Sequence, residues 1–361
     1  MRNIFREFPV VSQALLTAAG TLTLLSCGSD DEAQPIYNLS KDGNNVFVLN
    51  EGQFGTPNGE VSLFSKTSKK VVDNSTFKTV NQRDLGDVVQ SMTVVGERGY
   101  LVINNSQKLE VVDVRTFAGV ATVTGLDQPR YAVAAAPDKV YITEWTSGAT
   151  GRVSVLDTRT NKISKTIAVG GQPEKPLLAG GKVYVPNSDA NTISVINPAT
   201  DAVESTLTVT DGPGSLVQDA AGAVWVLCGG ITRYGGAPNY PVLSSTPGNL
   251  IKLNAANTAT AQSLPFATSG PAGLRANTAG TQLYYRYRSG LYQLSTTATA
   301  LPAAPLIRRS FYGVDIDPRD NTIYGTIAPF TSAGRFIRYQ ASGAAIDSFN
   351  VSLLPNGFVF Y

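Results

Sequence analysis

Aromatic, guanidinium and amide side chains stand in short polar segments between apolar stretches, and they are the strongest candidates for a binding site. Aromatic rings supply stacking area, while guanidinium and amide groups supply directed hydrogen bonds. Together they suit a large polar ligand or a protein partner. The candidate ligand-binding residues are Gln53, Phe54, Arg130, Tyr131, Trp145, Arg233, Tyr234, Tyr240, Arg286, Arg288 and Tyr312.

Catalysis finds less support in the sequence. The chain contains no histidine, which excludes histidine-based triads, histidine metal ligands and a histidine general base. No glycine-rich phosphate loop opens a helix. The acidic residues Glu51, Glu144 and Glu174 are widely separated, and the sequence places no pair of carboxylates at a catalytic distance. We therefore expect no enzyme activity, no catalytic residue, no cofactor and no metal site.

One acidic segment is compatible with two interpretations. Asp315, Asp317, Asp320 and Asn321 offer oxygen ligands at the short spacing that calcium prefers. The same residue types also form tight turns, as in the comparable segment 136–139. We favour the turn.

A repeat of about forty residues determines the architecture. Residues 153–173 (VSVLDTRTNKISKTIAVGGQP) are followed forty positions later by residues 193–213 (ISVINPATDAVESTLTVTDGP). The register continues backward along the chain with a shift of 44, because the loop at 144–152 is four residues longer than its counterpart at 104–108.

Within each repeat, apolar and polar residues alternate as they do in half-buried strands. No helical stripe of useful length follows the N-terminal leader. Each repeat is therefore interpreted as four strands of one propeller blade, and we predict an all-β, seven-bladed β-propeller over residues 44–361. The expected blades are residues 44–87, 88–128, 129–172, 173–212, 213–270, 271–309 and 310–352.

The two ends of this propeller should meet. The first blade begins at Asn45 without an inner strand, while the tail from Leu354 to Tyr361 has the pattern of an inner strand with no blade after it. We expect the tail to complete blade one and close the ring, which pairs strand edges that would otherwise invite aggregation.

Loops from all blades converge on one face of a propeller, and the candidate residues lie in the links that should reach this face. The longest departure from the repeat, residues 229–248 in blade five, is expected on the same face. A long loop rich in glycine and proline that carries Arg233, Tyr234 and Tyr240 is expected to be functional, with a disordered surface loop as the alternative.

Residues 1–26 are typical of a lipoprotein signal peptide. Arg2 and Arg6 precede an apolar run at 10–25, which is too short for a comfortable membrane span. The run ends in Leu24-Leu25-Ser26-Cys27, which resembles the lipobox of bacterial lipoproteins, so Cys27 is the expected lipidated residue. An ordinary secretory leader is the alternative.

Residues 27–43 should form the lipidated cysteine and a flexible tether, because few of their side chains are apolar. The acidic run Asp30, Asp31 and Glu32 resembles the signal that some Gram-negative bacteria use to send lipoproteins to the outer face of the outer membrane. A solvated tether without targeting information is the alternative. We expect a protein anchored to the outer membrane through its lipid alone and facing the cell exterior.

The net charge and the cysteine content argue against a nucleic-acid partner and against an internal disulfide. The formal net charge of +2 gives no case for a nucleic-acid partner. Once Cys27 carries a lipid, only Cys228 remains, so an internal disulfide is excluded. Cys228 ends an apolar strand at 224–227 and is expected to be a buried, non-catalytic residue.

The repeat also resembles a known group of propellers. The pattern V-x-V-[ILN]-D/N-x-x-T over residues 88–270 is similar to YncE-like propeller repeats. The opening segments 46–55 (VFVLNEGQFG) and 59–64 (GEVSLF), with the tail 355–358 (PNGF), resemble the DUF5074 family of surface lipoproteins. That family includes BtuG-type proteins, which capture cobalamin and sit as a lid on a TonB-dependent outer-membrane transporter. The resemblance implies a seven-bladed propeller and ligand capture for uptake.

We therefore expect a surface binding protein that captures a scarce nutrient and passes it to a TonB-dependent transporter, with cobalamin or another corrinoid as the first candidate. A propeller module that binds a protein or a glycan is the first alternative. A propeller lactonase or lyase is the second, and the lack of histidine and of an assignable acid pair argues against it.

Overall fold

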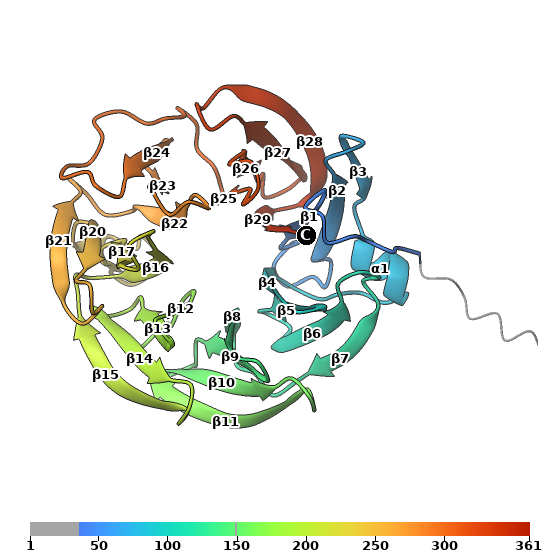
Figure 1. Ribbon diagram of the computed structural model, residues 1–361, viewed down its shortest axis with the longest axis horizontal. Coiled ribbons are helices and arrows are strands. Elements are labelled where there is room, and N and C mark those ends of the chain that lie inside the picture. The colour runs from blue at the N-terminus through green and yellow to red at the C-terminus, as the bar shows by residue number, and fades with distance from the viewer. Residues whose placement is uncertain (1–35, 149) are drawn as a thin grey trace, which may run out of the picture. The chain divides into compact units, whose positions relative to one another are not determined.

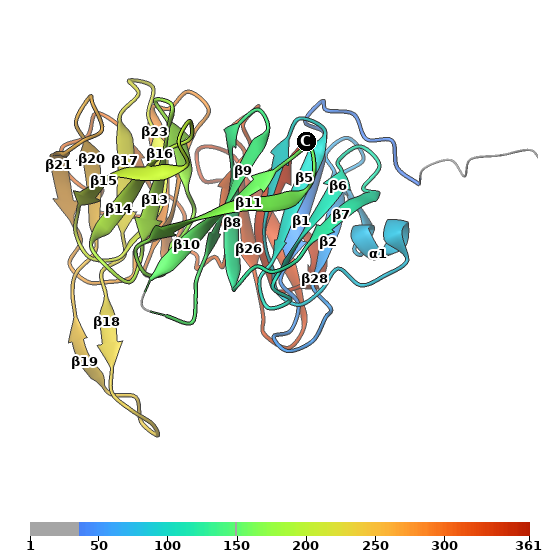
Figure 2. The ribbon, with the colours of Figure 1, turned by 90° about the horizontal axis from the view of Figure 1, so that it is seen from below.

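The computed structural model describes residues 36–148 and 150–361. In this part of the chain, seven antiparallel sheets follow one another around a ring (Figure 1). The structure is thus an all-β, seven-bladed propeller, as the forty-residue repeat predicts. Figure 2 shows the same ring from its edge.

Blades one to four each contain four strands. In chain order these are β1 (Asn45–Asn50), β2 (Glu60–Ser65) and β3 (Lys70–Asp73); β4 (Val89–Val95), β5 (Arg98–Ile103), β6 (Lys108–Asp113) and β7 (Gly119–Val123); β8 (Pro129–Ala136), β9 (Lys139–Glu144), β10 (Gly151–Asp157) and β11 (Lys162–Val169); β12 (Leu177–Ala179), β13 (Lys182–Asn187), β14 (Thr192–Asn197) and β15 (Ala202–Thr208). The fourth strand of blade one comes from the C-terminal tail.

Blades five to seven are less regular. Their strands are β16 (Pro213–Gln218), β17 (Val224–Cys228), β20 (Asn249–Leu253) and β21 (Thr260–Pro265); β22 (Ala272–Ala276), β23 (Gln282–Tyr287) and β24 (Gly290–Ser295); β25 (Val314–Ile316), β26 (Ile323–Ile327), β27 (Ala333–Tyr339) and β28 (Ala345–Leu353). Blade six has three strands, and a single bridge between Leu291 and Ile307 stands where its outer strand would be.

The tail closes the ring as expected. Strand β29 (Pro355–Phe360) pairs antiparallel with β1, with Val48 opposite Phe358 and Val46 opposite Phe360. The backbone groups of Asn45 and Tyr361 exchange two further hydrogen bonds, of 3.3 and 2.9 Å. Blade one therefore joins the beginning and the end of the described chain into one sheet, in the order β29, β1, β2, β3.

The hydrophobic core lies between the blades. Seven clusters of buried side chains each join two neighbouring blades, and the last one joins blade seven to blade one. A strand inside the ring is therefore covered on both faces: β9 is buried at five of its six residues, whereas the outer strand β11 alternates between exposed and buried residues. This packing explains why the outer strands carry the clearest period of two.

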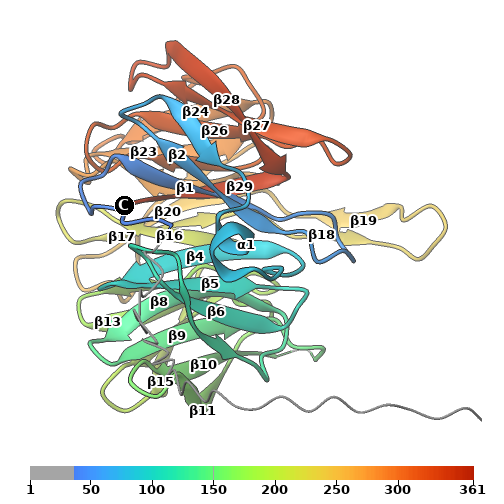
Figure 3. The ribbon, with the colours of Figure 1, turned by 90° about the vertical axis from the view of Figure 1, so that its right-hand side faces the viewer.

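Two elements depart from the simple repeat. A short helix, α1 (Thr76–Asn81), follows β3 (Figure 3). Its Phe77 packs into the core between blades one and two. The insertion in blade five forms an ordered hairpin of β18 (Thr232–Tyr234) and β19 (Val242–Ser245), which projects away from the ring (Figure 2). The helix was not expected, because its six residues show no apolar stripe.

The predicted signal peptide, the lipidated Cys27 and the first part of the tether lie outside the described residues. Within the part of the chain that is described, no helix has the length and the apolar character that a membrane crossing requires.

Candidate functional site

A cavity of about 940 Å³ lies in the middle of the ring and is lined by every blade. The links between second and third strands and the segments that enter each inner strand supply its walls. Seven of the eleven residues predicted from the sequence line it: Gln53, Phe54, Arg130, Tyr131, Trp145, Arg286 and Tyr312. We call this space the central cavity.

The other four predicted residues lie elsewhere. Tyr234 and Tyr240 belong to the projecting hairpin and are about 60% exposed, and Arg233 on the same hairpin pairs with Asp189 at 2.7 Å. Arg288 lies in the turn after β23, where its guanidinium group contacts the ring of Tyr287 instead of the cavity. The structure therefore does not bring these four residues together with Trp145.

Aromatic side chains project at the opening of the central cavity. Phe54 is 76% exposed, Phe330 74% and Tyr312 40%, although large apolar side chains are usually covered. They come from blades one and seven and from the link before β25, and all three line the cavity. We call them the rim aromatic residues, and they offer stacking area to a ligand that enters.

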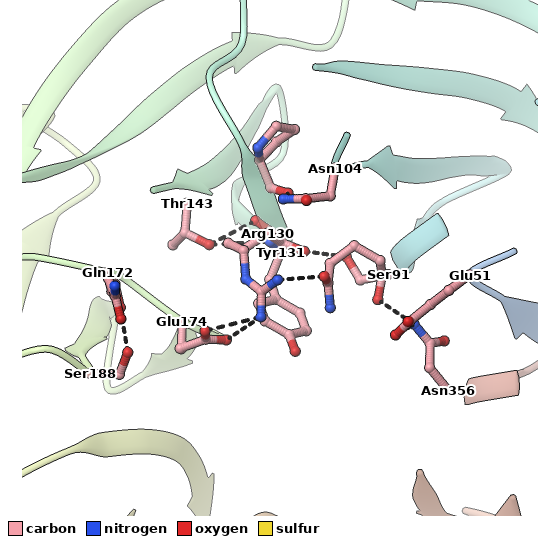
Figure 4. A network of polar contacts seen from close by, with 12 residues as sticks. Glu51, Ser91, Asn104, Arg130, Tyr131, Thr143, Gln172, Glu174, Ser188 and Asn356 are labelled. Carbon is pink, nitrogen blue, oxygen red and sulfur yellow. Dashed lines mark hydrogen bonds and ion pairs between the residues drawn. The ribbon is translucent and has the colours of Figure 1, made fainter. Parts of the chain in front are cut away.

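Arg130 is held in the cavity wall by partners from neighbouring blades (Figure 4). Its guanidinium group donates to Gln90 and to Glu174, the latter at 3.1 Å, and its Cζ lies 4.1 Å from the ring centre of Trp145. Burial raises the pKa of Glu174, and the charge of Arg130 partly offsets this rise. The pair therefore presents an oriented cation and a carboxyl group side by side.

A second network ties the tail to the wall. The Glu51 carboxyl group accepts hydrogen bonds from Asn356 at 3.0 Å and from the Tyr312 hydroxyl at 2.9 Å (Figure 4 shows the first). Burial raises the pKa of Glu51, although both bonds oppose the rise. Asn356 also donates to the backbone of Val89 and Gln90, so the tail, blade one and blade two meet here.

Cations outnumber carboxylates on the cavity wall. Lys175, Arg275 and Arg286 line it in addition to Arg130, against Glu51, Glu174 and Asp315. Arg275 forms an ion pair with Asp315. Tyr131 lies nearby, and burial raises the pKa of the Tyr131 hydroxyl to about 12. The arrangement can stack a planar group and donate hydrogen bonds to a polar one.

The eleven candidates leave out part of this wall. Glu51, Glu174 and Lys175 lie in the same converging links as the candidates, and Arg275 follows such a link on β22, so their position in the sequence pointed to this face. The cavity residues beyond the predicted set include Glu51, Gln90, Glu174, Lys175, Arg275, Asp315, Phe330 and Asn356.

The acidic segment at 315–321 forms the turn that the sequence favours. Asp317 accepts a hydrogen bond from the backbone N–H of Arg319 at 3.0 Å and pairs with Lys66 at 2.6 Å, while Asp315 faces the central cavity. Among residues 36–148 and 150–361, no three acidic or cysteine side chains gather as metal ligands would. Cys228 is fully buried, and this burial raises the pKa of its thiol to about 11.

Comparison with known families places the chain. Residues 44–360 match the family described as "Domain of unknown function (DUF5074)". The chain belongs to the DUF5074 family. A search of the curated proteins finds no match.

Solved structures share the fold of this DUF5074 protein. A quinonprotein alcohol dehydrogenase-like protein from Bacteroides thetaiotaomicron is 12% identical, with a TM-score of 0.65 over 88% of this chain and 78% of that one. A putative 6-phosphogluconolactonase from Bacteroides fragilis is 12% identical, with a TM-score of 0.63 over 90% and 99% of the two chains. Another from Bacteroides uniformis is 15% identical, with a TM-score of 0.62 over 88% and 100%. These likenesses establish the propeller fold alone.

Proposed function

We propose that this protein is a lipid-anchored capture protein whose central cavity binds a large polar nutrient, with cobalamin or another corrinoid as the first candidate. The observation that carries the proposal is the cavity of about 940 Å³ with the rim aromatic residues at its opening. Its volume lies near the upper end of the roughly 300–1,000 Å³ of ligand sites. A ligand of corrinoid size would fill it and still extend to the rim.

Binding without bond chemistry fits the polar groups of the wall. Glu174 is engaged by Arg130, and Glu51 by Asn356 and Tyr312. Each carboxyl group therefore already accepts hydrogen bonds that fix its position, as expected in a preformed binding site. We propose no catalytic residue, and no cofactor or metal enters this function.

Location and hand-over extend the proposal. The lipobox around Cys27 and the acidic run behind it support an anchor in the outer membrane with the propeller at the cell exterior. The resemblance to BtuG-type proteins supports delivery of the ligand to a TonB-dependent transporter. The lipid is the only membrane contact that this proposal requires.

Calorimetry with cyanocobalamin tests the capture function directly. The chain lacking residues 1–27 retains every described strand and both partners of the ring closure. We expect saturable heat and a rise in the melting temperature. No heat and no thermal shift at high cyanocobalamin concentration would remove the corrinoid from the proposal.

A protein-binding or glycan-binding module remains the second candidate, and the hairpin supports it. Tyr234, Tyr240, Val242 and Leu243 are each at least 60% exposed on this projection. Deletion of residues 232–246 distinguishes the two functions: capture by the central cavity predicts the same heat with cyanocobalamin before and after the deletion, whereas a module that binds a protein or glycan through the hairpin predicts no heat with cyanocobalamin in either form.

The lipid anchor gives a prediction of its own. Cys27→Ser should release the protein from membranes, because the lipid chains are the proposed attachment of this domain. Membrane fractionation in high salt measures the change, and a variant that still pellets with membranes contradicts the anchor. The matched variant, with Asp30, Asp31 and Glu32 replaced by alanine, should stay membrane-bound but lose accessibility to external protease.

A further inference from the structure

We propose that the captured ligand carries an anionic group, a phosphate or a carboxylate, and that Lys175, Arg275 and Arg286 bind this group in the central cavity. The inference rests on the proposed function only in taking the central cavity as the binding site. We call these three residues the cationic cluster, and all of them line the cavity.

Lys175 is the cation that the protein leaves free. It stands between Pro173 and Pro176 in the segment that enters blade four, and the neighbouring Glu174 N–H donates to the Pro186 carbonyl at 2.9 Å. Its ammonium group has neither a hydrogen bond nor an ion pair to any residue that the structure describes. Two prolines and a bridge between Pro173 and Asn187 therefore hold an unpaired lysine against the cavity.

Hydrogen bonds fix the orientation of Arg275 and Arg286 but use only some of their guanidinium N–H donors. Arg275 on β22 pairs with Asp315 through Nε and donates from Nη1 to the Leu274 carbonyl at 3.0 Å. Arg286 on β23 donates from Nη1 to the carbonyls of Phe311 and Tyr312, at 3.0 and 2.6 Å. Its Nε is buried without a hydrogen-bond partner among the described residues. Because an atom without exposed surface cannot contact a ligand, the donor that remains for one is Nη2, which has no hydrogen-bond partner among the described residues and is not one of these buried atoms.

A glycine makes room for the Arg286 guanidinium group. Gly273 has φ +70°, and a Cβ atom there would lie 3.1 Å from Arg286 Nε and 3.2 Å from Nη2. Both the backbone conformation and the close approach therefore require glycine at this position. The guanidinium group lies directly over the β22 backbone at the cavity wall.

Charge balance explains why this part of the wall favours an anion. The carboxylate of Glu174 pairs with Arg130, and that of Glu51 accepts hydrogen bonds from Asn356 and Tyr312. Of the cavity carboxylates, only Asp315 is therefore left to neutralise the cationic cluster. The positive charge of Arg275 is the main cause that lowers the pKa of Lys175 to about 8, although the lysine side chain keeps exposed surface in the cavity. Burial together with Arg275 lowers the pKa of Arg286. An anion among the three cations relieves this repulsion and accepts charge-assisted hydrogen bonds.

Inorganic sulfate tests the site independently of any corrinoid, because its charge is constant across the range in which Lys175 titrates. In the chain lacking residues 1–27, sulfate should raise the melting temperature above the value in chloride at equal ionic strength. The difference should be largest below about pH 8 and decrease above it, because Lys175 loses its proton as the pH rises through its pKa. Citrate in place of sulfate tests whether carboxylates suffice.

Lys175→Met should remove this difference, and Lys162→Met is the matched control. Lys162 is an exposed lysine on the outer strand β11, outside the cavity lining, so its loss changes the net charge equally. Because Lys175 has no partner among the described residues and its charge is repelled by Arg275, its replacement should not lower the melting temperature in chloride. An equal response of native protein and Lys175→Met to sulfate overturns the anion site.

Corrinoids separate this proposal from the capture function. Cyanocobalamin carries a phosphodiester, and cobinamide lacks it. If both proposals hold, Lys175→Met should weaken cyanocobalamin binding by about tenfold or more and leave cobinamide binding unchanged. Equal affinity of native protein and variant for cyanocobalamin overturns the anion site and leaves capture intact. Sulfate binding that depends on Lys175, without corrinoid binding, overturns the corrinoid and leaves the anion site intact.

Discussion

Deletion of residues 354–361 is expected to abolish cooperative folding of the propeller. The deletion removes β29, exposes the pairing edge of β1 and opens the sheet that joins the two ends of the ring. It also removes Phe358 and Tyr361 from the two clusters that flank blade one. Circular dichroism and calorimetric melting measure the loss, and a truncated chain with the melting temperature of the full propeller would contradict this closure.

A single substitution tests the same closure in a chain that still folds. Phe358 is 7% exposed and lies between Tyr324 and Phe336, with ring centres 5.3 and 5.6 Å away. Phe358→Ala should cost roughly 3–5 kcal/mol of the free energy of unfolding, the usual range for a core phenylalanine. Phe330→Ala makes the same chemical change at a side chain that is 74% exposed, so it should leave the melting temperature of the ligand-free protein unchanged.

The sequence alone was sufficient for the ring because each blade repeats one strand pattern. The boundaries expected from the forty-residue period fall between the observed sheets, except that β28 runs one residue beyond the expected end of blade seven, and the unpaired pattern at 354–361 predicted the partner of β1. Blade six shows the limit of this reasoning. Its outer position is held by one bridge at Ile307, because residues 296–310 lack the alternation that would form a strand.

The candidate site was only partly predictable, because a cavity depends on the direction of each side chain as well as on its place in a loop. Arg286 and Arg288 are two residues apart, yet Arg286 lies over Gly273 in the cavity and Arg288 lies in an exposed turn. Tyr234 and Tyr240 lie outside the cavity for a similar reason, because the two short strands of the hairpin place them away from the ring. No local pattern in the sequence reports these directions.

Replacement of rim aromatic residues is expected to cause a large loss of affinity for cyanocobalamin. Replacing both Phe54 and Phe330 by alanine should weaken cyanocobalamin binding by roughly a hundredfold, since each would lose an anchor of about 1.4 kcal/mol or more. Both side chains are about three-quarters exposed in the free protein, so their truncation removes little packing from the fold. Calorimetry on the double variant gives the affinity, and an unchanged melting temperature without ligand shows that the propeller is intact.

The matched control is the pair Tyr234→Ala and Tyr240→Ala on the projecting hairpin. These aromatic residues have similar exposure, 60% and 61%, but they do not line the central cavity. If exposed aromatic surface bound the ligand without regard to position, both double variants would weaken binding equally. Capture in the central cavity requires loss with the Phe54 and Phe330 pair alone, and loss with the tyrosine pair alone would move the site to the hairpin. Trp145 is unsuited to this test, because it also packs against Arg130 at 4.1 Å and its removal would disturb the cavity wall itself.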